Sequence, residues 1–164
     1  GSFKKFCNLL GTKSITEFNY RYADPKIAHV FVGVSIRNQE EANTLIKELR
    51  QSGLATEDMS NNEMAKLHVR HLVGGHAHDV KNEILYRFEF PDRPGALMNF
   101  LNNMSHNWNI SLFHYRNHGA DYGRVLIGIQ VPPEEKSDFK AFLNQLGYRY
   151  WEETKNPAYK LFLG

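Results

Sequence analysis

The sequence has few of the features that mark secreted or membrane proteins. Cys7 is its single cysteine, so no internal disulfide can form, and we expect a reducing, cytoplasmic setting. No apolar run approaches the roughly 18 residues that a membrane span needs, and no signal peptide is evident. We therefore expect no membrane partner.

A strong charge of either sign is also absent. The 164 residues carry a net charge of +2, and no more than two Lys or Arg residues follow one another. Nucleic-acid-binding domains gather basic residues on one face, so we expect no nucleic-acid partner. The length suffices for one ordinary domain or for two small ones that share a core.

Hydrophobic periodicity predicts alternating helices and strands. In the first half we expect helices at 2–11, 38–53 and 63–69 and strands at 14–22, 29–36 and 54–59. In the second half we expect strands at 84–90, 108–118, 122–131 and 148–153, helices at 94–106 and 134–146, and a last helical turn after Pro157. The Gly- and His-containing stretch 74–79 reads as a connector, which predicts subdomains at 1–79 and 80–164.

The second half repeats the first. Phe6 matches Phe100 and Leu10 matches Met104, in each case 94 residues later. After one inserted residue the offset is 95, with the pairs Ile15/Ile110, Phe18/Phe113, Tyr20/Tyr115, Arg21/Arg116, Val30/Val125 and Gly33/Gly128. The offset returns to 94 for the pairs Glu40/Glu134, Leu49/Leu143 and Gly53/Gly147. Because register persists through a turn, two strands and two helices, we infer an internal repeat.

The repeat predicts the fold. The second copy reads strand, helix, strand, strand, helix, strand, which is the order of a ferredoxin-like unit. The first copy starts at Gly1, the residue that matches Gly95, and so lacks the strand that precedes Gly95. We expect an α+β fold of two tandem βαββαβ subdomains, the first without its N-terminal strand. Either the chain is a fragment, or another segment fills that place in the sheet.

The turn around Gly95 is one candidate site. Glycine lets a ligand approach the backbone, and the helix that follows offers free N–H groups and a positive dipole end to a carboxylate. Leu97, Leu101 and Met104 form an aliphatic wall beyond it. Spacing alone nevertheless favours an ordinary strand-to-helix turn with a core-facing helix.

A second candidate is the Tyr-Arg pair that occurs at Tyr20-Arg21 and again at Tyr115-Arg116. Neighbouring side chains of a strand point to opposite faces. Tyrosine offers a hydroxyl and an aromatic wall, and arginine can hold a carboxylate with two hydrogen bonds. An aromatic cross-strand pair with a solvated arginine explains the pattern equally well.

Other chemistry-bearing residues favour structural interpretations. Cys7 lies on an apolar helix face without an obvious His or Asp partner, as a buried thiol does. Ser2-Phe3-Lys4 superficially resembles the lysine motif of pyridoxal-phosphate lyases, but the apolar-Arg-Gly continuation and a Gly-rich phosphate loop are missing. Four histidines, His68, His71, His76 and His78, resemble a metal cluster. Zinc needs three or four ligands that converge at a fixed geometry, so we expect no metal site from them.

Several runs resemble the C-terminal regulatory region of biosynthetic threonine dehydratase (threonine ammonia-lyase). They extend over essentially the whole chain: Thr16–Arg21, Glu63–Arg70, Phe88–Leu97, Trp108–Arg116 and Asn156–Ala158. The resemblance implies two ACT-like subdomains that bind isoleucine, a feedback inhibitor, and valine, which relieves the inhibition. It also implies a parent enzyme that is a generally tetrameric pyridoxal-phosphate lyase and converts L-threonine to 2-oxobutanoate and ammonia.

The resemblance also implies site residues. Tyr20 and Tyr115 match the family's effector-site tyrosines, and Gly95 belongs to the turn beside them. Positions linked to loss of feedback inhibition match Arg70, Leu97, Leu101, Met104 and Arg116. The catalytic domain and its cofactor lysine lie outside this sequence, so we expect no catalytic residue and no cofactor in the chain itself.

Two alternatives stay open. A stand-alone tandem ACT sensor of amino acids would have the same fold without an attached enzyme. An RNA-binding βαββαβ module would use its strand aromatics to stack bases, although its usual Lys/Arg-Gly-Phe-Gly-Phe signature and a basic face are missing.

Overall fold

The computed structural model describes residues 2–22, 26, 28–63, 65, 75–104, 106–117, 119 and 121–164. Within these ranges, no helix has the length and apolar character needed to cross a membrane. The predicted helix at 63–69 and the candidate residues Arg70, His68 and His71 lie wholly or mostly outside the described residues.

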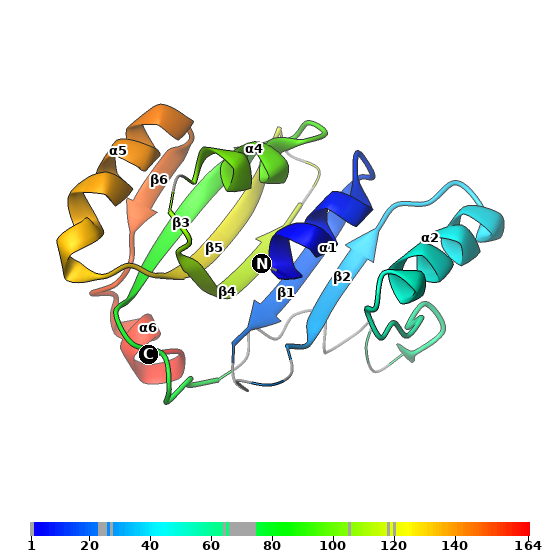
Figure 1. Ribbon diagram of the computed structural model, residues 1–164, viewed down its shortest axis with the longest axis horizontal. Coiled ribbons are helices and arrows are strands. Elements are labelled where there is room, and N and C mark those ends of the chain that lie inside the picture. The colour runs from blue at the N-terminus through cyan, green and yellow to red at the C-terminus, as the bar shows by residue number, and fades with distance from the viewer. Residues whose placement is uncertain are drawn as a thin grey trace.

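Among the described residues, six strands form one antiparallel sheet in the order β2-β1-β4-β5-β3-β6 (Figure 1). Its strands are β1 (Ile15–Arg21), β2 (Val30–Val34), β3 (Glu83–Pro91), β4 (Asn109–Arg116), β5 (Tyr122–Gln130) and β6 (Arg149–Glu152). The main helices are α1 (Ser2–Leu10), α2 (Gln39–Gln51), α4 (Ala96–Asn103) and α5 (Lys136–Leu146), which lie on one face of the sheet (Figure 1). The 3-10 turn Pro133–Glu135 precedes α5, and α6 (Pro157–Phe162) follows β6.

The C-terminal copy of the repeat comprises β3, α4, β4, β5, α5 and β6. Its strands lie in the order β4-β5-β3-β6, which is the ferredoxin-like arrangement that the sequence predicts. The N-terminal copy comprises α1, β1, β2 and α2. Within the described residues no strand pairs with the outer edge of β2, the position that β3 occupies beside β5 in the other copy. The α+β fold of two tandem units is thereby confirmed.

The strand predicted at 54–59 is wrong. The described backbone there forms no ladder, and the Arg50 guanidinium donates to the Thr56 carbonyl at 2.8 and 3.1 Å. Leu54 still packs against the core. A side chain has therefore taken a backbone acceptor that a neighbouring strand would have used, which periodicity cannot reveal.

The repeat recurs in three-dimensional detail. Register shifts between Ile15 and Glu17 in one copy and between Ile110 and Leu112 in the other, which are matching positions. A Cβ atom at Gly33 would lie 2.5 Å from Thr16 Oγ1, and one at the matching Gly128 would lie 2.9 Å from Ser111 Oγ. Each copy thus needs a glycine in its next strand, at the point where that strand lies beside the register shift.

The two copies meet through β1 and β4, which pair antiparallel. Asn19 lies opposite His114, its own match in the repeat, so a pseudo-two-fold axis passes through this pair. Exchanging the copies turns the pair Phe18–Tyr115 into Phe113–Tyr20, and the structure contains both pairs. The contact is therefore self-complementary, as in a symmetric dimer.

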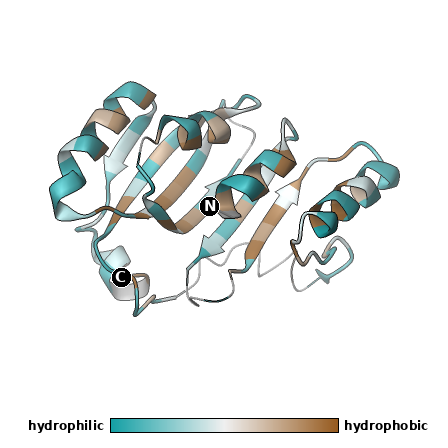
Figure 2. Cartoon of the chain, viewed as in Figure 1, coloured by the Kyte–Doolittle hydropathy of each residue, from teal (hydrophilic) through white to brown (hydrophobic). Residues whose placement is uncertain are grey.

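The core lies between the sheet and the helices. Phe18 and Phe113 meet edge to face across the seam, with ring centroids 5.1 Å apart. A second aromatic group, with Phe88, Phe100 and Phe142 at its centre, fills the C-terminal copy. Hydrophobic residues accordingly follow the strands and the inner helix faces, while the outer helix faces are hydrophilic (Figure 2).

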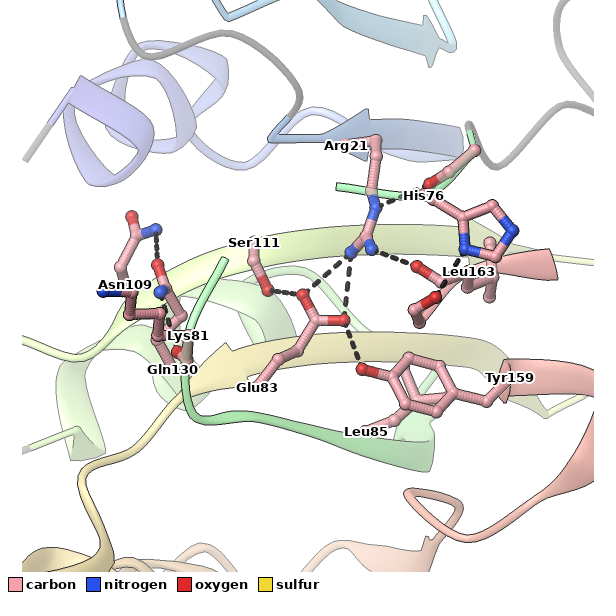
Figure 3. A network of polar contacts seen from close by, with 12 residues as sticks. Arg21, His76, Lys81, Glu83, Leu85, Asn109, Ser111, Gln130, Tyr159 and Leu163 are labelled. Carbon is pink, nitrogen blue, oxygen red and sulfur yellow. Dashed lines mark hydrogen bonds and ion pairs between the residues drawn. The ribbon is translucent and has the colours of Figure 1, made fainter. Parts of the chain in front are cut away.

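A buried ion pair joins the two copies at the end of the seam (Figure 3). Arg21 Nη1 of β1 donates to both carboxylate oxygens of Glu83, at 3.1 and 2.9 Å, and the two side chains are only 6 % and 5 % exposed. Ser111 Oγ and the Tyr159 hydroxyl each donate to the same carboxylate, at 2.7 and 2.8 Å. These additional hydrogen bonds offset part of the cost of burying the charges.

The same arginine also holds the connector and the C-terminal segment. Its Nε donates to the Gly75 carbonyl at 3.1 Å, and its Nη2 donates to the Leu163 carbonyl. The His76 ring contacts the Gly164 carbonyl beside it (Figure 3). Arg21 therefore links four separate stretches of the chain.

We expect Glu83→Gln to lower the free energy of unfolding by about 3–5 kcal/mol, because Arg21 would keep a buried charge without its counter-charge. Urea denaturation measures this change. Arg37→Gln is the matched control, since it breaks the Arg37–Glu41 pair in which the Arg37 side chain is 87 % exposed, and it should change little. Equal effects of the two substitutions would contradict the role given to the buried pair.

Tyr159 should make stability fall at high pH. Burial, followed by its hydrogen bond to Glu83 and the charge of Glu83, raises the pKa of Tyr159 from 10.0 to about 12. Because the pKa is higher in the folded state, its contribution is complete below pH 10 and is lost as the pH rises to about 12. Urea titrations at several pH values measure the free energy of unfolding. Between pH 10 and 12 it should fall less steeply in Tyr159→Phe than in the unchanged chain, and an equal fall in both would refute this.

Candidate ligand-binding site

A pocket of about 270 Å³ opens between the two copies on the helix-covered face. Its floor is the aromatic seam, with Phe18, Phe113 and Tyr115. One wall is the end of α1 and the turn after it, with Cys7, Gly11, Lys13, Ser14 and Ile15; the opposite wall is the β3–α4 turn and the start of α4, residues 90–98. A ligand here would touch both copies at once.

Gly95 shapes the second wall. Its φ of 85° lies in the left-handed region that favours glycine, and the backbone then enters α4 at Ala96. Gly95 has no side chain to cap the helix. The first turn of α4 therefore presents its positive dipole end at the pocket wall.

Tyr115, on the pocket floor, lies beside two polar groups, Asp92 and Asn117. Burial raises the pKa of Tyr115, the charge of Asp92 raises it further, and a hydrogen bond with Asn117 lowers it. Asn117 Nδ2 donates to Asp92 Oδ1 at 3.1 Å. The phenol therefore stays a neutral hydroxyl at physiological pH, next to a carboxylate with a fixed orientation.

Charges of both signs line the pocket. Lys13 lies on the α1 side, where its Nζ is 4.0 Å from Glu41 Oε1 and its side chain is 29 % exposed. Asp92 and Arg93 lie on the opposite side and are exposed. An apolar floor with a cation and an anion at its rim suits a small zwitterion with an apolar side chain.

Cys7 is buried, as the sequence predicts, and it lines the pocket wall. Burial raises the pKa of its thiol from 9.0 to about 12. Such a thiol is almost entirely protonated at neutral pH and is a poor nucleophile.

The sequence-based candidates fall into three groups. Gly95, Leu97 and Tyr115 line the pocket together. Arg116 follows Tyr115 in β4 and so points to the opposite face of the sheet, where Glu17 lies across from it. Arg70 lies outside the described residues.

The third group is related to the pocket by the repeat. Leu101 matches Cys7, and Tyr20 matches Tyr115, so both lie where exchange of the copies would place a counterpart of the pocket. Leu101 is 4 % exposed, Met104 packs against the core, and Tyr20 lies 5.6 Å from the Phe3 ring. None of these three residues is among those that line the pocket.

Sequence reasoning missed the first wall. Lys13, Ser14 and Ile15 carry no motif and come from the other copy. The repeat was the signal that could have found them, because Ile15 matches Ile110 and thus starts a core strand beside the seam. Across the described residues no group of three or more His, Cys, Asp or Glu side chains is arranged to hold a metal ion, and His76 and His78 stack on each other with centroids 6.4 Å apart.

A family model described as the C-terminal regulatory domain of threonine dehydratase matches residues 1–69 and 74–163. The chain belongs to this family. It is 54 % identical over 164 residues to the biosynthetic L-threonine dehydratase IlvA of Escherichia coli, and 53 % identical over 163 residues to that of Burkholderia multivorans. The mitochondrial threonine dehydratase of Saccharomyces cerevisiae is 47 % identical over 173 residues.

Each match covers 99 % of this chain but only 32 %, 32 % and 30 % of the relative. The chain therefore spans about a third of the length of these curated relatives. Among solved structures, an aspartate kinase from Synechocystis superposes with a TM-score of 0.54 at 15 % identity, over 93 % of this chain and 26 % of the kinase. At that identity the likeness concerns the fold alone.

We expect Cys7 to react with iodoacetamide only slowly in the folded chain. A pKa of about 12 in place of 9.0 makes the reactive thiolate about 10³-fold scarcer, and burial blocks access. Mass spectrometry at intervals, on folded and urea-unfolded samples, measures the two rates. Equally fast labelling in both samples would show that Cys7 is accessible.

Proposed function

We propose that the pocket binds isoleucine and valine and that this chain is the effector-binding region of a threonine dehydratase. The single observation that carries the proposal is the pocket between the two copies of a domain belonging to a regulatory family. Its apolar floor suits a branched aliphatic side chain, and its rim suits the charged ends of an amino acid.

The proposed orientation follows from the two walls. The side chain of the effector lies against Leu97 and the aromatic floor of Phe18 and Phe113. Its carboxylate faces the start of α4, where helix N–H groups favour negative charge. Tyr115, on the same floor, offers its ring and its hydroxyl to the ligand.

Opposite effects of two such similar ligands need more than one site or state. Isoleucine and valine differ by one methylene, which a hydrophobic pocket distinguishes by only about 1–3 kcal/mol. The counterpart position, with Tyr20, Leu101 and Met104, is the second site we propose, together with Phe3 and Phe6. Arg70 and Arg116 stay predicted effector residues on the strength of the family resemblance.

Regulation requires the effector to bind two arrangements of the domain unequally. A ten-fold difference in affinity corresponds to about 1.4 kcal/mol, within the usual coupling range of about 1–3 kcal/mol. Because the pocket has one wall from each copy, a small rotation about the seam would change both walls. We propose the division at residues 1–79 and 80–164 as the pair of bodies that move.

The activity itself belongs to the proposed parent enzyme, a cytoplasmic tetramer that deaminates L-threonine to 2-oxobutanoate with pyridoxal phosphate. The described residues of this chain do not fit that cofactor. Lys4, the lysine of the motif-like Ser2-Phe3-Lys4, is exposed on α1 and matches Met98 of the repeat. The proposed site of the cofactor is the catalytic domain of the same polypeptide.

Calorimetric titration of the chain with L-isoleucine and L-valine tests the proposal. We expect binding that Tyr115→Ala weakens by about ten-fold or more, because ring contacts and a hydrogen bond are lost, and that Leu97→Phe weakens by filling the pocket. Ile36→Ala is the aliphatic control, since Ile36 is 41 % exposed and is not among the pocket residues. A folded sample that gives no heat with either amino acid would overturn the proposal.

A further inference from the structure

We propose that Gly123 of β5 is a positioning residue: the Tyr115 ring lies against its bare backbone, and this contact keeps the ring from entering the space of the pocket. This inference rests on the proposed function, since it concerns how the pocket stays open to an effector. It adds a residue that is not itself among those that line the pocket. Gly123 acts on the effector only through Tyr115.

The contact between Gly123 and Tyr115 leaves no room for a side chain. Tyr115 belongs to β4 and pairs with Val125 of β5, so Gly123 is its diagonal neighbour on the same face of the sheet. A Cβ atom at Gly123 would lie 2.7 Å from both Cζ and the hydroxyl oxygen of Tyr115, and closer still to Cε2. Carbon atoms in van der Waals contact lie about 3.5–4.0 Å apart, so even alanine would displace the ring.

The requirement at Gly123 is for space rather than for backbone freedom. Gly123 is buried, lies opposite Phe90 in the ladder between β3 and β5, and is not one of the glycines with a positive φ. A larger residue could therefore adopt the same backbone, and glycine inside a strand is otherwise unfavourable. The three atoms nearest to the added Cβ all belong to Tyr115, so the room that Gly123 leaves is room for this ring.

The strand order determines where a displaced ring would go. β4 lies between β1 and β5, and Tyr115 lines the pocket floor together with Phe18 of β1 and Phe113 of β4. A methyl group on β5 would push the Tyr115 ring away from β5 and therefore toward β1, over the seam. The ring would then occupy space that the proposed effector needs.

The same contact holds the Tyr115 hydroxyl beside its polar neighbours. Asn117 forms a hydrogen bond with that hydroxyl, and the charge of Asp92 acts on it. Asn117 in turn donates to Asp92 at 3.1 Å. Because the ring lies against Gly123, moving it would also separate the hydroxyl from this pair, so Gly123 fixes both the ring and its polar end.

The repeat offers an internal comparison. Tyr20 matches Tyr115, and at the same offset of 95 the residue that matches Gly123 is Ala28, which carries a methyl group. Ala28 is exposed and precedes β2. Tyr20 lies against the Phe3 ring, with centroids 5.6 Å apart, and is only 7 % exposed. Space for the tyrosine at this position is therefore a feature of the second copy, and the two matching tyrosines are held differently.

A double-mutant cycle separates the positioning of Tyr115 from a general effect on folding. L-isoleucine is titrated calorimetrically into the whole chain and into Gly123→Ala, Tyr115→Ala and the double variant. We expect Gly123→Ala to weaken binding by about ten-fold or more and to lower the urea midpoint, because the ring must move. In the Tyr115→Ala background the same substitution should change neither quantity for the worse, since no ring is left to displace.

Gly128→Ala is the matched control. Gly128 lies in the same strand and is buried, but it belongs to the opposite face, where a Cβ atom would lie 2.9 Å from Ser111 Oγ. This substitution should lower the urea midpoint without weakening L-isoleucine, whether or not Tyr115 is present. Carbon-13 NMR of labelled tyrosine rings adds a direct measurement. The Tyr115 signal, identified by its absence from Tyr115→Ala, should shift in Gly123→Ala and not in Gly128→Ala.

The two proposals fail in different ways. If the unchanged chain is folded and binds no L-isoleucine, the proposed function is wrong and the role of Gly123 in binding falls with it. If the chain binds L-isoleucine and a folded Gly123→Ala retains the affinity, or loses it equally with and without Tyr115, only this inference is overturned. If Gly123→Ala does not fold, the double variant decides, because Tyr115→Ala should restore folding and a failure to do so would contradict the proposed contact.

Discussion

The antiparallel pairing of β1 with β4 is the constraint on which the rest of the structure depends. It joins the two copies into one sheet, brings Phe18 against Phe113 and sets α1 beside α4. The pocket exists only because these helices come from different copies and leave a gap above the seam. The Arg21–Glu83 ion pair lies at the end of the same seam. The strand pairing that forms the pocket floor and the ion pair that joins the two copies are therefore neighbours along β1.

Local pattern was enough to predict most elements but not their partners. The strands and helices of the C-terminal copy lie within a few residues of their predicted bounds, because their core faces are regular. Pairing of β1 with β4 joins residues almost a hundred positions apart, and no local periodicity encodes it. The strand expected at 54–59 failed because an alternating stretch forms a strand only where a neighbouring ladder is available to it.

The Tyr-Arg motif, which occurs once in each copy, has different surroundings in the two copies. Arg21 and Arg116 match in the repeat, yet the Arg21 side chain is buried against Glu83 while Arg116 is half-buried and lies across from Glu17. The difference arises outside the motif: the carboxylate that holds Arg21 with two hydrogen bonds belongs to Glu83 of β3, whereas Arg116 faces a residue of β1 across the seam. Gly95, Leu97 and Tyr115, which the sequence proposed as effector-binding residues largely through the family resemblance, belong to one copy, whereas Lys13 on the facing wall comes from the other copy and carries no such signal.

The self-complementary seam has a consequence for mass action. If the two copies were separate molecules, this strand pairing would make a dimer, and dilution would separate it and remove the pocket. A covalent connector turns the same contact into an intramolecular one with a high effective concentration. The fraction of molecules with an assembled pocket therefore does not vary with protein abundance, and under the proposed function the occupancy of the pocket then follows the concentration of the effector.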